Sequence, residues 1–176
     1  MRYRLPAVAT VVLLALTLGL LFAHVLEMGP KLGYPPQLYT TLNTSLYPFF
    51  GTVGAVVEVG ALLATAALAV LIRHDRALCV PTAVSAAIQA AVLGLWFAVV
   101  SPVNSAFSTA RPHVPPEFVA LRTRWETGHT IDAALILIAL AVLLAGLLRA
   151  HTGRSTAPRI NQSARAHQPG SARPQI

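Results

Sequence analysis

Four long apolar stretches divide the chain, and polar segments separate them. They cover about residues 5–27, 47–72, 77–100 and 126–148. Each stretch is close to or above ~20 residues, the length that an α-helix needs to cross the hydrocarbon core of a bilayer. The pattern predicts an all-α fold, an integral membrane four-helix bundle that occupies residues 1–150.

The first stretch has a second interpretation, because Arg2 and Arg4 precede an uncharged run in the way that a secretory signal begins. That run is long for a signal, and no clear A-x-A cleavage site follows it. A first membrane span is therefore preferred. At the other end, residues 151–176 are rich in Arg, Ser, Pro, Gln and His and have little to bury, so we predict a disordered tail.

Two substantial loops are expected between the spans. Residues 28–46 contain the turn signals Gly29-Pro30 and Pro35-Pro36, and residues 101–125 contain further prolines. Tyr39 and Tyr47, in and beside the first loop, fit the aromatic belt that lies at membrane surfaces. Trp96 and Trp125 are interpreted as belt anchors in the same way.

The distribution of charged residues indicates what the chain binds and how it is oriented in the membrane. Only 11% of the residues are charged, against about a quarter in soluble domains. The net charge of +7 comes from basic residues that flank spans or fill the tail, so we expect a lipid bilayer and no nucleic acid as partner. Nine Arg fall on the side of the two termini and four Lys or Arg on the other, which predicts a multi-pass plasma membrane protein with both termini cytoplasmic.

Two His/Glu pairs have helical spacing and lie at the same membrane level. His24-x-x-Glu27 ends the first span, and Glu126-x-x-His129 begins the fourth. Residues three apart share one face of a helix, so each pair can direct a carboxylate and an imidazole at one spot. The simpler alternative is that these are polar residues at helix ends, within reach of water.

Other polar residues are expected around this site. Asn104 lies just past the outer end of the third span, and Trp125 directly precedes Glu126. Asp132 follows His129 by three residues and is expected to orient its ring. Glu58 lies eleven residues into the second span, which places it near the middle of the bilayer, below the site.

Three motifs resemble those of one family. These are Phe22-Ala23-His24-Val25-Leu26-Glu27 followed by Pro30-Lys31-Leu32, then Ser101-Pro102-Val103-Asn104, then Leu121-Arg122 with Arg124-Trp125-Glu126-x-x-His129. Over residues 5–148 the chain is similar to the anthrone oxygenase-like family of small four-span membrane proteins, largely a domain of unknown function. Family members often carry a basic residue where this chain has Asp132.

The resemblance implies a membrane-embedded oxidoreductase, a monooxygenase that oxidises a phenolic or polycyclic substrate with dioxygen and uses no dedicated organic cofactor. The substrate would enter from the membrane. We expect His24 or His129 to act as general base, with Glu27 and Glu126 orienting the imidazoles. Asn104 would hydrogen-bond a developing oxyanion.

Two other classes of function use the same residues. His24, Glu27, Glu126 and His129 are suitable ligands for a single divalent metal ion, whereas a bis-His haem is disfavoured by the neighbouring carboxylates. A non-catalytic accessory subunit or small transporter is the third hypothesis. Glu58 discriminates between a transporter and an oxygenase, because transport by a proton-coupled transporter should depend on it.

Overall fold

The computed structural model describes residues 3–155. Four helical stretches in that range are long and apolar enough to cross a membrane, which confirms the predicted all-helical bundle of four spans. In chain order the elements are α1 (Arg4–Leu32), α2 (Pro36–Ser45), α3 (Tyr47–Leu71), α4 (Arg76–Leu95), a π-helix (Trp96–Val100), α5 (Ser101–Ala110) and α6 (Phe118–Ser155).

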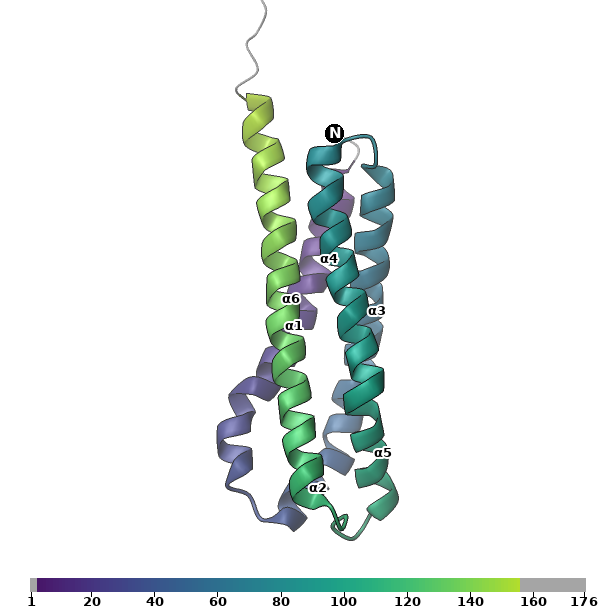
Figure 1. The fold of residues 1–176 in the computed structure, drawn as a ribbon, viewed down its shortest axis with the longest axis vertical. Helices are drawn as coiled ribbons and strands as arrows, with labels where there is room; N and C mark the ends of the chain where they lie inside the picture. Colours follow the sequence, from purple (N-terminus) through teal and green to yellow (C-terminus); the bar gives the residue numbers. More distant parts are fainter. Residues whose placement is uncertain (1–2, 156–176) are drawn as a thin grey trace, which may run out of the picture.

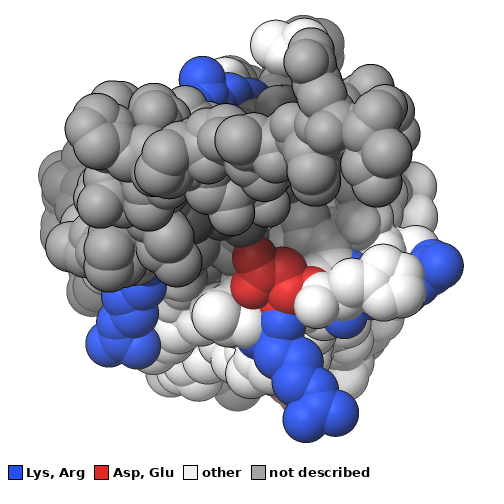
Figure 2. Space-filling view, turned by 90° about the horizontal axis from the view of Figure 1, so that it is seen from above, with Lys and Arg blue, Asp and Glu red and all other residues white. Residues whose placement is uncertain are grey.

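The long helices form a closed ring in the order α1, α3, α4, α6, with each helix packed on its two neighbours. Both described ends of the chain lie at one end of this bundle, and α2 and α5 lie at the other (Figure 1). Lys and Arg side chains surround a small acidic area on the end that carries the termini (Figure 2). We call the opposite end, where α2 and α5 lie, the α2/α5 end.

The first predicted loop is mostly helical, because Gly29-Pro30 does not end α1. Pro30 lies in the last turn of that helix, where the missing N–H costs a single backbone hydrogen bond and the chain leaves the helix after Leu32. A short helix, α2, then begins at Pro36, a residue type that suits the first helical position. The consequence is that Lys31 lies on the helix that carries His24.

The second predicted loop is also shorter than expected. The third span continues through the π-helix into α5, because Pro102 lies in the first turn of α5 and does not interrupt it. Helix α6 begins at Phe118, eight residues before the predicted span, and runs to Ser155. Residues 151–155 are therefore helical and not disordered as predicted, and the rest of the predicted disordered tail, residues 156–176, lies outside the described part of the chain.

Helix α1 faces the interior with a repeat of seven residues. Ala7, Leu14 and Leu21 form one buried line, and a second buried line three residues further on is polar. That second line consists of Thr10, Thr17, His24 and Lys31. The two threonines donate hydrogen bonds to carbonyls of their own helix. His24 and Lys31 instead contact side chains, Glu27 of the same helix and residues of other elements.

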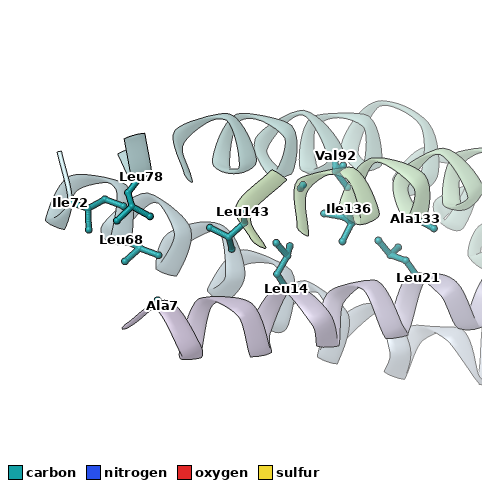
Figure 3. Packing of buried hydrophobic residues seen from close by; sticks show 11 residues of the cluster. Ala7, Leu14, Leu21, Leu68, Ile72, Leu78, Val92, Ala133, Ile136 and Leu143 are labelled. Carbon is teal, nitrogen blue, oxygen red and sulfur yellow. The ribbon is translucent and has the colours of Figure 1, made fainter. Parts of the chain in front are cut away.

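The apolar half of the interior is a continuous cluster. Leu14 and Leu21 of α1 lie against Ile136 and Leu143 of α6, with Val92 of α4 close by (Figure 3). The outer surface of the helices is equally apolar. Leu5, Phe49 and Val56 are 83%, 72% and 71% exposed, as expected for side chains that face lipid.

Close packing between α4 and α6 depends on Gly146. A Cβ atom there would lie 2.4 Å from Cγ of Pro81, whereas one at Gly19 would meet nothing within 4 Å. We expect Gly146→Ala to lower the free energy of unfolding by about 1–3 kcal/mol, because the helices must separate. Thermal unfolding in detergent measures this effect, and Gly19→Ala is the matched control. Equal melting temperatures for the two variants would contradict the close contact.

Candidate functional site

A buried ammonium group is the centre of the α2/α5 end. Lys31 is 2% exposed, and its Nζ lies 3.2 Å from Oε1 of Glu126 and 3.9 Å from Oε2 of Glu27. The same Nζ lies 4.3 Å from the ring centroid of Trp125 and 5.0 Å from that of Tyr47. Two carboxylates and two aromatic faces therefore compensate the loss of hydration of one cation.

Two tyrosines complete this ion network. The Tyr39 hydroxyl donates to Oε1 of Glu126 at 2.9 Å, and the Tyr47 hydroxyl donates to Oε2 of Glu27 at 2.7 Å. Burial, reinforced by the negative charge of Glu126, raises the pKa of Tyr39, which keeps its phenol protonated and able to donate. The network thus joins α1, α2, α3 and α6.

The two predicted histidines meet directly below this network. The ring centroids of His24 and His129 are 4.6 Å apart, and Nδ1 of His24 lies 3.8 Å from Oε2 of Glu27. The second pair does not act as predicted, because Glu126 directs its carboxylate to Lys31 and Tyr39. The His129 ring instead uses Nδ1 to bond the backbone carbonyl of Trp125 at 3.0 Å.

That backbone bond decides the tautomer of His129. A carbonyl oxygen can only accept, so Nδ1 of the neutral ring must carry the proton, and Nε2 is left with a free lone pair. His129 lines a cavity of about 540 Å³. The ring of His129 therefore contributes an acceptor nitrogen on a residue that lines the cavity.

Asn104 is oriented by Trp125. The indole Nε1 donates to Oδ1 of Asn104 at 2.8 Å, which leaves the amide N–H groups of this cavity-lining residue as donors. Trp125 itself is 1% exposed and stacks on Tyr47 at 5.2 Å between ring centroids. Trp125 is therefore a buried residue that packs inside the site. The prediction that it lies in the aromatic belt at the membrane surface was wrong.

Two arginines fasten the elements around the site. Arg122 donates to the carbonyl of Leu32, the last residue of α1, at 3.1 Å. Arg124 donates to the carbonyl of Ala98 in the π-helix at 3.0 Å. At Leu32 the cation meets a carbonyl at the C-terminus of a helix, where positive charge is stabilising.

The two remaining predicted carboxyl groups lie deeper in the bundle. Asp132 is fully buried, but it does not orient the His129 ring, because the Trp125 carbonyl does so. Within the described residues neither oxygen of Asp132 has a hydrogen-bond partner, and the same holds for Oε1 of Glu58. Glu58 lines the cavity.

The four predicted metal ligands do not fit a metal site. The ammonium of Lys31 contacts both Glu27 and Glu126, and Glu126 also accepts the hydrogen bond of Tyr39. Across residues 3–155 no three His, Cys, Asp or Glu side chains converge as a ligand set.

Sequence reasoning missed three members of the site, Lys31, Tyr39 and Tyr47. A signal for Lys31 was present, since it follows His24 by seven residues and Glu27 by four, on one helical face. It was lost when the Gly29-Pro30 pair was interpreted as a turn. The tyrosines have no such signal, because a belt tyrosine and a buried one look alike in sequence.

The fold and this site define a polytopic helical membrane protein with a buried His/Glu/Lys cluster beside a cavity. No protein family, no curated protein and no solved structure matches the chain. The similarity to anthrone oxygenases stays a prediction from the three motifs.

Removing the buried cation should destabilise the bundle. We expect Lys31→Met to lower the free energy of unfolding by about 3–5 kcal/mol, because the buried carboxylate of Glu126 loses its counter-ion. Chemical unfolding in detergent measures this, with Arg73→Met as the control that removes an exposed cation. Adding Glu126→Gln to Lys31→Met should recover part of the loss. No recovery would show that the charges are not coupled.

Proposed function

We propose that this protein is a membrane-embedded oxidoreductase that oxidises a phenolic or polycyclic aromatic substrate with dioxygen. The observation that carries the proposal is the free Nε2 of His129, oriented by the Trp125 carbonyl, in a wall of the cavity. A base in an apolar cavity suits abstraction of a proton from a carbon next to a carbonyl. The motif resemblance supports the same reaction class.

The cavity suits an apolar aromatic molecule. Its volume of about 540 Å³ lies in the range of small-molecule sites, and Tyr47, Phe50 and Trp96 are among its walls. A Cβ atom at Gly51 or Gly54, both of which line the cavity, would meet nothing within 4 Å. The first half of α3 therefore leaves room for a ligand.

The reaction begins with a proton transfer. Nε2 of His129 takes a proton from a substrate CH₂ group, and the charge spreads onto the substrate oxygen, where the amide N–H of Asn104 donates. The carboxylate of Glu27, beside the His24 ring that contacts His129, adds negative potential that favours the imidazolium. The histidine pair therefore holds the proton while the substrate is a carbanion.

Dioxygen then accepts the electron pair of the carbanion and forms a carbon–oxygen bond. The peroxide anion takes its proton back from His129. The hydroperoxide loses its remaining C–H proton as the O–O bond breaks, which gives a ketone and water. One substrate CH₂ and one O₂ thus become one C=O and one H₂O, so dioxygen is the only oxidant that this reaction consumes.

Turnover of anthrone by the purified chain tests this proposal. We expect oxygen uptake and anthraquinone absorbance above the uncatalysed rate, and a fall of about 100-fold or more in His129→Gln, which lacks a basic nitrogen. His113→Gln is the matched control, because His113 is exposed in the loop before α6. Circular dichroism checks that both variants fold. Wild-type protein without turnover, or His129→Gln with full turnover, would contradict the proposal.

The same proposal includes an orientation in the plasma membrane with both termini cytoplasmic. Arg4, Arg73, Arg76 and Arg149 belong to the end of the bundle that carries the termini. At the α2/α5 end Lys31 is buried and paired, which leaves only three arginines there to oppose that bias.

Cysteine labelling in intact cells checks the orientation. In a Cys79→Ser background, a membrane-impermeant maleimide should label His113→Cys in the loop before α6 and leave Arg73→Cys unlabelled. Permeabilised cells are the control, in which both positions should react. The reverse pattern in intact cells would place the termini outside.

A further inference from the structure

The inner part of the cavity is lined by one carboxyl group, and a second carboxyl group lies next to it. Glu58 of α3 lines it, and Asp132 of α6 lies close enough to Glu58 to interact with it electrostatically. Asp132 is 0% exposed, and neither of its oxygens has a hydrogen-bond partner among residues 3–155. Unpaired carboxyl groups inside an apolar bundle require a cation or a proton.

No basic side chain of the described residues balances these groups within the cavity. Its lining contains neither Lys nor Arg, and Glu58 is the only lining residue with a formal charge when the histidines are neutral. The buried Lys31 is paired with Glu27 and Glu126 and does not line the cavity. The cavity is therefore electrostatically complementary to a cation.

The other walls indicate what kind of cation fits. Five aromatic side chains line the cavity, and a ring face that no other cation occupies attracts a positive charge. They are Tyr47, Phe50, Trp96, Phe97 and Trp125. A small metal ion requires several oxygen ligands at short distance, which rings do not supply. An organic ammonium ion uses the rings, the carboxylates and the volume together.

We propose that the cavity binds a lipophilic organic cation, an aromatic ammonium ion. Its positive charge lies against Glu58, with Asp132 behind it adding negative potential. Its apolar body lies among the aromatic rings. This binding is independent of the proposed oxidation, because it uses the carboxyl end of the cavity and requires no chemistry at His129.

A pair of probes that differ only in charge tests the inference. They are (naphthalen-2-ylmethyl)trimethylammonium and its uncharged isostere 2-neopentylnaphthalene. Equilibrium dialysis of the detergent-solubilised full chain against protein-free micelles measures the binding of each. We expect the ammonium ion to bind about tenfold or more tightly than the isostere, and Glu58→Gln to remove that difference. Glu117→Gln, which removes an exposed carboxylate before α6, should retain it.

Two further variants make the test decisive. Asp132→Asn should reduce the preference for the ammonium ion, and it replaces Glu58→Gln if that variant does not fold. Gly54→Leu should exclude both probes, because its side chain extends into the open space of the cavity. The inference is overturned if wild-type protein binds both probes equally, if both carboxyl variants keep the preference, or if Gly54→Leu binds normally. None of these readouts involves anthrone turnover, so the two proposals fail separately.

Discussion

The buried charge of Lys31 is the constraint on which the site depends. An ammonium ion inside an apolar bundle is stable only where carboxylates and ring faces replace its water. Glu27, Glu126 and the rings of Tyr47 and Trp125 provide this, and Tyr39 of α2 holds Glu126 in place, so four different helices contribute. Satisfying one cation therefore fixes how these helices meet, and with it the separation of His24 and His129.

The interior of the bundle carries its polar groups in layers along the axis. The ion network lies at the α2/α5 end, the imidazole pair follows, and the carboxyl groups of Glu58 and Asp132 come next. Beyond them Gln89 donates to Thr65, so α3 and α4 also share a polar contact in the core. The cavity reaches the second and third layers, which gives it a basic end and an acidic end in one apolar space.

This separation explains how one cavity supports two proposals. Proton abstraction requires a neutral imidazole with a free nitrogen, which the backbone bond to His129 provides. Binding of an ammonium ion requires carboxyl groups without local partners, which Glu58 and Asp132 provide. Each function uses groups that the packing has left unsatisfied, and such groups are costly in a membrane unless a ligand or a proton meets them.

The sequence by itself determined the helical class, the number of spans and the common level of His24 and His129. These follow from the length of apolar runs and from helical spacing, both of which are local properties. Only the tertiary structure decided which side chains pair with one another in the site. Whether a proline ends a helix depends on what holds the residues after it, and after Pro30 the ion pair of Lys31 with Glu126 joins the end of α1 to helix α6. That ion pair joins residues far apart in the chain, which no local pattern contains.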